Sequence, residues 1–79
     1  MSWYVYILRC ADDTLYTGIT TDVVRRLREH NEAKLGAKYT RARRPVVLVY
    51  KKRFTSRSTA AIREAALKKL SREEKLMLL

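Results

Sequence analysis

The stretch WYVYILRCADDTLYTGIT, from Trp3 to Thr20, decides the fold. Residues 3–10 are dense in β-branched and aromatic side chains, which favour strands. Asp12 and Asp13 then indicate a turn, because an aspartate side chain can bond to the backbone two residues further on. Residues 15–20 return as a second strand. The stretch therefore predicts a β-hairpin near the start of the chain.

A helix follows the hairpin. Residues 23–34 (VVRRLREHNEAK) form its body, Thr21 or Asp22 offers an N-cap, and Gly36 is a suitable stop. Residues 34–44 (KLGAKYTRARR), all of whose charged side chains are basic, are expected to form a loop.

The second half of the chain repeats the alternation of strand and helix. Residues 46–50 (VVLVY) predict a short apolar strand, and residues 51–53 a charged exit from it. A serine or threonine within residues 56–59 can cap a second helix that runs to about Leu70. Residues 71–74 (SREE) read as a capping box for a terminal turn.

These elements predict one small α+β domain, residues 1–79, in the order β-β-α-β-α with a short C-terminal helix. The expected sheet is three-stranded and mainly antiparallel, with helices flanking it. A chain of this length buries only about 60% of its unfolded surface, which excludes two lobes or a large cofactor cavity.

The charge balance points to a polyanionic partner. Lys and Arg number 18 and Asp and Glu number 8, giving a net charge of +10. The alternative is solubility alone, but evenly mixed signs would supply that without such an excess. Nucleic acid is therefore the expected partner.

Several functional classes are disfavoured by the same composition. Cys10 is the only cysteine and His30 the only histidine, so an internal disulfide and a zinc site are excluded. No apolar run reaches the roughly 18 residues of a membrane span, and no secretory signal is evident. We expect a cytoplasmic protein with no membrane contact and no small-molecule cofactor.

The first predicted helix presents an arginine and the histidine beside its apolar face. Successive helix residues are turned by about 100° around the helix axis. With Val23 at 0°, the positions of Val23, Leu27 and Val24 place the centre of the buried face at about 45°. Arg26 and His30 flank that face. The alternative is that Arg26 packs its stem along the core edge and that His30 is a satisfied boundary residue.

Tyrosines and basic residues form a second pattern suited to nucleic acid. Tyr4, Tyr6 and Tyr16 lie in the hairpin, and phenol groups suit both phosphate contacts and base stacking, although they also suit half-buried strands. The candidate nucleic-acid-binding residues share one basic segment: Lys38, Tyr39, Arg41, Arg43 and Arg44. The alternative for that segment is a solvated charge run.

Three short motifs together resemble a known family. Tyr4-Val5-Tyr6 is followed, ten residues on, by Tyr16-Thr17-Gly18, and then by Arg26-x-x-x-His30 on the helix. Over nearly the whole chain this resembles the GIY-YIG nuclease superfamily, most of all its small stand-alone bacterial members. Tyr4 stands where the family has a glycine.

The resemblance implies metal-dependent hydrolysis of DNA phosphodiester bonds. Tyr6 would assist activation of the attacking water, and Tyr16 would help to orient the water and the phosphate. Arg26 would bind the scissile phosphate, and His30 would support proton transfer or substrate contact. Gly18 would allow a close approach of the backbone.

The resemblance also implies that Glu64 binds a single Mg²⁺ (or Mn²⁺). One carboxylate, with water and phosphate completing the shell, is normal for that ion. Periodicity favours a different interpretation, because an apolar stripe of Ile62, Ala66 and Leu70 leaves Glu64 on the solvent side. We follow the resemblance.

A shared site requires Tyr6 and Tyr16 on one face of the hairpin. A two-residue turn at Asp12-Asp13 would pair residues whose numbers add to an odd total, and the tyrosines would then face opposite ways. A loop of odd length, or one bulge, gives an even total and brings them together. We predict the second arrangement.

The expected function is therefore DNA cleavage, in repair or another processing step. The first alternative is a nucleic-acid-binding module that retains the nuclease fold without catalysis. A second is a protein-interaction module that uses residues 76–79 (LMLL), although we expect this apolar end to dock on its own core.

Overall fold

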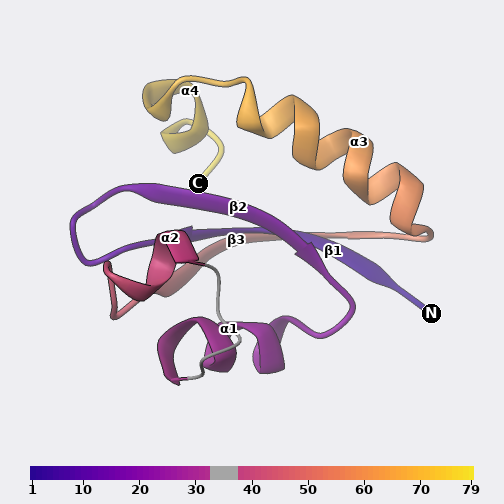
Figure 1. Ribbon diagram of the computed structural model, residues 1–79. Coiled ribbons are helices and arrows are strands. Elements are labelled where there is room, and N and C mark those ends of the chain that lie inside the picture. The colour runs from indigo at the N-terminus through magenta and orange to yellow at the C-terminus, as the bar shows by residue number, and fades with distance from the viewer. Residues whose placement is uncertain (33–37) are drawn as a thin grey trace.

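The computed structural model describes residues 1–32 and 38–79. Its elements are β1 (Trp3–Arg9), β2 (Leu15–Thr20), α1 (Val23–Glu32), α2 (Lys38–Arg41), β3 (Val47–Phe54), α3 (Arg57–Lys68) and α4 (Arg72–Leu76). The strands form one antiparallel sheet in the order β2-β1-β3 (Figure 1). The predicted α+β fold is confirmed, with α2 as an addition.

The hairpin has the register that a shared site requires. Tyr6 lies opposite Gly18 and Leu8 opposite Tyr16, so paired residue numbers add to an even total. The cause is a three-residue loop, residues 11–13, which the Cys10 N–H closes by donating to the Thr14 carbonyl at 2.8 Å. Asp13 takes the left-handed conformation, with φ of 66°, that such loops need at their last position. Tyr6 and Tyr16 therefore lie on the same face, as predicted.

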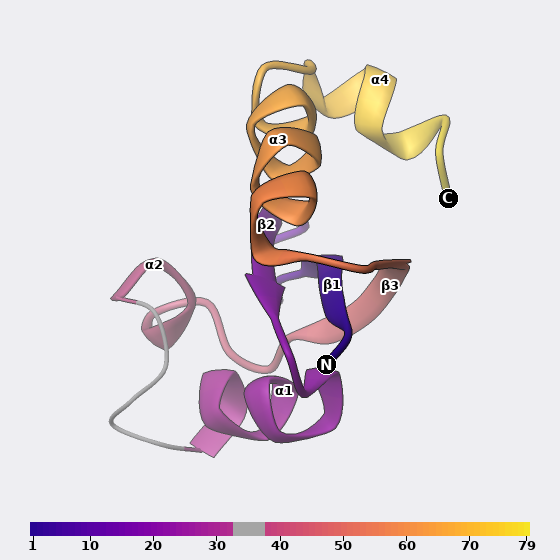
Figure 2. The same ribbon diagram turned by 90° about the vertical axis from the view of Figure 1, so that its right-hand side faces the viewer.

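Helices cover both faces of the sheet, and β1 is buried between them. Figure 2 shows α3 on one side and α1 on the other, with α2 beside α1. Val5 and Ile7 point toward α3, where Ala60 and Leu67 complete a buried cluster. Tyr6 and Leu8, the alternate residues of the strand, point to the face that α1 covers.

Strand β3 is longer than predicted. It continues to Phe54 through Lys51, Lys52 and Arg53, which the sequence analysis had assigned to a charged exit. All three side chains are exposed, and they pair with β1 opposite Tyr6, Val5 and Tyr4. Charged residues are common on an edge strand because its outer side faces water. A run of charged residues therefore does not mark the end of such a strand.

Two predictions for the middle of the chain have different outcomes. A short helix, α2, lies within the segment expected to be a loop, and it buries Thr40 completely. The predicted helix stop at Gly36 lies outside the described residues.

The predicted caps are present. The Asp22 Oδ1 accepts from the Arg25 N–H at 3.0 Å, which selects Asp22 over Thr21 as the cap of α1. Ser56 caps α3 by accepting from the Thr59 N–H, and Ser71 and Glu74 form the predicted capping box of α4.

The C-terminal end does not dock on the core. Arg72 anchors α4 to the hairpin by donating to the Asp13 carbonyl at 2.9 and 3.1 Å. The exposed fractions of the four residues that follow in the apolar end are 38% for Leu76, 87% for Met77, 40% for Leu78 and 50% for Leu79. The expectation of docking is therefore wrong, because the short helix turns its polar and apolar residues alike toward water. Within residues 1–32 and 38–79, no helix has the length and apolar character needed to cross a membrane.

Candidate active site

Two tyrosines and the histidine form one cluster beneath α1, which we call the tyrosine–histidine cluster (Tyr6, Tyr16 and His30). The ring centroids of Tyr6 and Tyr16 lie 6.4 Å apart, and the His30 ring lies 5.9 Å from Tyr6 and 5.1 Å from Tyr16. Tyr6 is only 2% exposed, and Tyr16 is half-buried. The strand register and the α1 periodicity thus bring together three of the residues that the sequence singled out.

Gly18 leaves the space in which the Tyr6 phenol lies. A Cβ atom built on Gly18 would lie 2.5 Å from the Tyr6 hydroxyl oxygen and 2.7 Å from Cζ. Real Cβ atoms do not approach other atoms so closely, so any larger residue must displace the ring. Gly18 therefore allows the backbone of the edge strand β2 and the Tyr6 ring to lie close together.

We expect Gly18→Ala to lower the free energy of unfolding by about 1–3 kcal/mol, because it overpacks a buried contact. Urea unfolding measures this effect. The control is the same substitution in a Tyr6→Ala background, where the ring is gone and the cost should largely disappear. Equal costs in the two backgrounds would contradict this assignment.

His30 is more deeply buried than the sequence predicted. It is 0% exposed, whereas Val24, which had been placed on the buried face, is 69% exposed. The buried face of α1 therefore includes His30 together with Leu27, which packs against the core, and the prediction that Val24 shares this face is wrong. The prediction gave more weight to the two valines of the first turn than to the single histidine nearly two turns later.

Both imidazole nitrogens of His30 have partners. Nε2 is hydrogen-bonded to the Tyr6 hydroxyl at 2.9 Å, and Nδ1 to the Thr40 hydroxyl at 2.8 Å. Burial, and then the nearby Arg26 guanidinium, lower the pKa of His30 from 6.5 to about 4. His30 is therefore a neutral, oriented imidazole. Thr40 was missed by the sequence analysis, since a lone threonine in a basic segment carries no distinctive signal.

The neutral histidine predicts a pH-dependent stability. Between pH 6.5 and about 4 the unfolded chain binds a proton at His30 that the folded chain does not, so the free energy of unfolding falls as pH drops through this window. The loss can reach about 3 kcal/mol. Urea unfolding between pH 7 and 4.5 measures it, and in His30→Gln the slope should flatten. An equal slope in the variant would contradict the assignment. The carboxyl pKa values of Asp12 and Glu74 are lowered, so those groups act at more acidic pH.

Arg26 reaches the cluster from α1. Its side chain is 26% exposed, and its Nη1 donates to the Glu29 carboxylate at 3.0 Å. Burial lowers the pKa of Arg26, but hydrogen bonding to Glu29 and to Tyr6 outweighs burial and raises it overall. Arg25, one residue earlier, has a 62% exposed side chain. The prediction that Arg26 and not Arg25 faces the site is consistent with these positions.

The pKa of Tyr6 is shifted by groups from three other elements. Burial, and then Tyr16, raise the pKa of Tyr6 to about 12, Arg26 opposes the rise, and Glu64 adds to it. Glu64 belongs to α3, on the other side of the sheet. The negative charge of its carboxylate nevertheless adds to the rise in the pKa of Tyr6.

Glu64 borders the buried side of α3. Ala60 and Leu67 are 0% exposed, whereas Ile62 is 71% exposed. The apolar stripe inferred from Ile62, Ala66 and Leu70 is therefore wrong, and with it the solvent-facing position of Glu64. The Glu64 side chain is 21% exposed, and its Oε2 lies 3.4 Å from the Lys68 Nζ.

The donor set fits a metal held by a single carboxylate. The described residues contain no group of three or more His, Cys, Asp or Glu side chains that could hold an ion. Mg²⁺ commonly binds through one or two carboxylates and completes its shell with water and phosphate oxygens. Glu64, half-buried, fits such an ion, while a dedicated all-protein cage does not exist among these residues.

The predicted nucleic-acid-binding residues divide into two groups. Lys38 and Arg41 are exposed. Arg43 instead donates to the Asp12 carboxylate at 3.0 Å and to the Tyr39 carbonyl at 2.8 Å, and Arg44 donates to the carbonyls of Glu29 and His30. These bonds fasten the segment to the hairpin loop and to the end of α1.

Tyr39 belongs to the packing of the cluster as well as to the surface. Its ring is stacked on Tyr16 with centroids 5.9 Å apart, and the Arg43 guanidinium carbon lies 4.1 Å from its centroid. It remains 39% exposed. Tyr39 thus extends the tyrosine–histidine cluster outward. Tyr50, by contrast, packs against the core on the α3 side.

Comparison with known proteins identifies the family of this chain. Residues 2–77 match the family described as the GIY-YIG catalytic domain. The UPF0213 protein DP2720 of Desulfotalea psychrophila is 59% identical over 70 residues, which cover 89% of this chain and 64% of that protein. The UPF0213 protein of Syntrophus aciditrophicus is 57% identical over 76 residues, 96% of this chain and 87% of that protein.

A solved structure agrees with the fold. The solution NMR structure of the UPF0213 protein BH0048 from Bacillus halodurans is 49% identical with a TM-score of 0.62, covering 99% of this chain and 82% of that one. The chain spans less than two thirds of the Desulfotalea protein, at 64%. Because the family match extends over nearly all of the sequence, and relatives exceed half identity, the chain belongs to the GIY-YIG family, and its matched relatives are UPF0213 proteins.

Proposed function

We propose that this protein is a divalent-metal-dependent endonuclease that hydrolyses phosphodiester bonds in DNA. The observation that carries the proposal is the convergence on one phenol of groups from separate elements. The Tyr6 ring of β1 lies 6.4 Å from the Tyr16 ring of β2, and its hydroxyl is hydrogen-bonded to His30 of α1. Arg26 of α1 and Glu64 of α3 act on its pKa in opposite directions. Family membership makes a nuclease the natural use of such a set.

Arg26 is the phosphate-binding group in this proposal. Its guanidinium is only partly exposed and lies between Glu29 and Tyr6. A planar guanidinium can offer two parallel donors to phosphate oxygens, and it stabilises the charge that grows on them during hydrolysis. Substrate phosphate would replace the Glu29 carboxylate as its anionic partner.

Tyr6 and His30 accept the proton of the attacking water in this proposal. With a pKa raised to about 12, the Tyr6 phenol keeps its proton at rest. When the Thr40 oxygen accepts from Nδ1–H, His30 Nε2 is left as the acceptor for the Tyr6 hydroxyl. The phenol oxygen can then take a proton from water while its own proton moves toward His30. Tyr16, packed against both rings, keeps them in place.

Glu64 would hold the metal ion. Such an ion supplies charge stabilisation at the phosphate oxygens and at the leaving oxygen. Lys68, ion-paired with Glu64 at 3.4 Å, has a 55% exposed side chain and can move away at little cost. The net charge of +10, with Lys38 and Arg41 exposed beside the cluster, would hold the DNA backbone without base reading.

A binding module without catalysis is the second candidate. The burial of Tyr6 and His30, each hydrogen-bonded inside the fold, favours it, because the same contacts would serve a purely structural core. The two candidates differ in their need for Glu64 and for metal.

The test is cleavage by the purified protein. Labelled single-stranded, duplex, flapped and branched DNA, and RNA, are incubated with Mg²⁺ or Mn²⁺ and with EDTA. We expect cleavage of at least one DNA form, abolished by EDTA and restored by excess Mg²⁺. Binding of these DNAs without cleavage under any metal condition would reject the endonuclease in favour of the binding module.

A further inference from the structure

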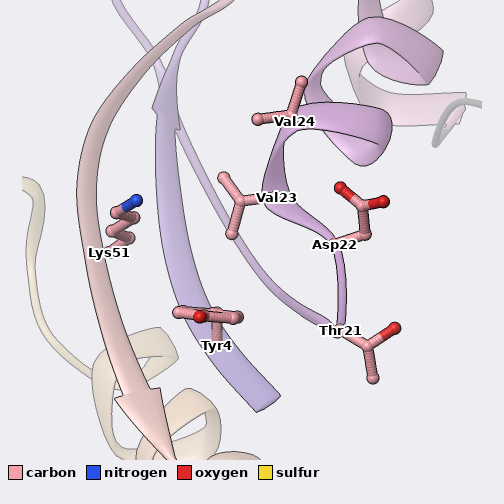
Figure 3. A pocket seen from close by; sticks show the side chains of 6 residues that line it. All are labelled: Tyr4, Thr21, Asp22, Val23, Val24 and Lys51. Carbon is pink, nitrogen blue, oxygen red and sulfur yellow. The ribbon is translucent and has the colours of Figure 1, made fainter. Parts of the chain in front are cut away.

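A pocket of about 260 Å³ opens between the start of α1 and strands β1 and β3. It is lined by Tyr4, Thr21, Asp22, Val23, Val24 and Lys51 (Figure 3). None of these residues belongs to the tyrosine–histidine cluster or has a role in the proposed hydrolysis. The pocket therefore needs its own explanation.

One wall of the pocket is an aromatic ring with a cation above it. The Lys51 Nζ lies 6.0 Å from the centroid of the Tyr4 ring. Lys51 pairs with Tyr6 across the sheet, and Tyr4 is two residues from Tyr6, so both side chains lie on the α1 face. Figure 3 shows the Tyr4 ring nearly edge-on, below Val23 and Lys51.

The opposite wall is apolar and exposed. Val24 is 69% exposed, and the half-buried Val23 and the half-buried Tyr4 ring line the pocket with it. Asp22 is the only acid that lines the pocket, and its Oδ1 is occupied in capping α1. A ligand would therefore place a flat apolar group between Tyr4 and the valines, and an anionic group at Lys51.

We propose that the pocket binds one unpaired nucleotide of a DNA strand, with its base on the Tyr4 ring and its phosphate on Lys51. This inference rests on the proposed function and names its substrate class, which is DNA with a single-stranded segment beside the cut. Aromatic rings bind bases in this way without regard to sequence.

Two observations favour a strand over a free nucleotide or a duplex. Lys51 lies directly opposite Tyr6 on β1, so the occupant is a neighbour of the hydrolytic site. The volume, about 260 Å³, is smaller than the roughly 300–1,000 Å³ of pockets for whole ligands, and fits one base. Bases in a duplex are stacked inside it and cannot reach a pocket without flipping out.

Neighbouring lysines provide a matched test. Lys51 and Lys52 are both exposed, and each lies near a ring, at 6.0 Å from Tyr4 and 5.9 Å from Phe54 respectively. Successive strand residues face opposite sides, so only Lys51 is at the pocket. Lys51→Ala and Lys52→Ala remove the same charge from the same strand on opposite faces.

Binding is measured in EDTA by fluorescence anisotropy, with a single-stranded oligonucleotide, a blunt duplex and a free nucleoside monophosphate. We expect Lys51→Ala and Tyr4→Leu to weaken single-strand binding about tenfold, and Lys52→Ala and Tyr4→Phe to change it less than about twofold. Blunt duplex binding should respond equally to both lysine variants.

Three results would overturn the inference. The first is an equal loss of single-strand affinity in Lys51→Ala and Lys52→Ala. The others are unchanged binding by Tyr4→Leu that thermal melting shows to be folded, and binding of the free nucleotide as tight as that of the strand. Because EDTA prevents metal-dependent cleavage, pocket binding can hold while the nuclease proposal fails, and the reverse. The two failures are therefore distinguishable.

Discussion

Replacement of Arg26 by alanine is expected to lower the single-turnover rate of DNA cleavage about 10²–10³-fold, the cost typical of removing one donor to the transition-state oxyanion. Arg26→Lys should recover little of it, because an ammonium group cannot offer two parallel donors. The rate is measured at saturating enzyme, so that weakened binding does not enter.

Arg25→Ala is the matched control for Arg26. It removes the same charge from the same helix, and Arg25 also contacts Glu29, at 3.9 Å, but its side chain is 62% exposed, against 26% for Arg26. We expect Arg25→Ala to retain most of the cleavage rate. Equal losses in the two variants would mean that overall charge, and not a phosphate-binding arginine, supports the reaction.

Replacement of Glu64 by glutamine is expected to remove metal-dependent cleavage, by at least about 10³-fold, while DNA binding in EDTA stays within about twofold of the wild type. Glutamine keeps the shape but not the charge that attracts a divalent ion. The lost ion pair with Lys68 should cost less than about 1 kcal/mol of stability, since the lysine is 55% exposed.

Two controls accompany Glu64→Gln. Lys68→Ala breaks the same ion pair and should leave cleavage largely intact, and Glu73→Gln removes an exposed carboxylate of α4. Cleavage that survives in Glu64→Gln, with an unchanged Mg²⁺ dependence, would exclude Glu64 as the metal ligand.

The fold was predictable where local signals agreed. β-Branched and aromatic residues in the hairpin, the capping serines and the capping aspartate each act within a few residues. The end of β3 was not predictable from local signals. Its charged residues extend an edge strand, and the length of that strand depends on pairing with β1. The short helix α2 is likewise held by contacts from elsewhere, such as the His30 bond to Thr40.

The site was predictable in part. The alternation of strand residues alone does not decide whether Tyr6 and Tyr16 share a face. The correct prediction also required a loop of odd length or a bulge between the strands. Helical periodicity selected Arg26 correctly but placed Val24 wrongly, because two valines suggested a face centre that the sheet does not cover. Periodicity also placed Glu64 on the solvent side, whereas its side chain is only 21% exposed. Its role as a metal ligand stays a prediction.

The contacts of Gly18, Thr40 and Arg43 could not be inferred from the chain alone. Each depends on a partner distant in sequence: the Tyr6 ring, the His30 imidazole and the Asp12 carboxylate. Residue type indicates what a side chain can do, whereas its partner is decided by the packing of the sheet and helices.

The most direct test of the central claim is one cleavage experiment with paired binding. Wild type, Arg26→Ala and Glu64→Gln are compared on single-stranded, duplex, flapped and branched DNA, with Mg²⁺, Mn²⁺ or EDTA, and DNA binding is measured on the same samples. The account predicts metal-dependent cleavage by the wild type, lost in both variants while Glu64→Gln still binds. Binding without cleavage by the wild type, unchanged in Glu64→Gln, would contradict it.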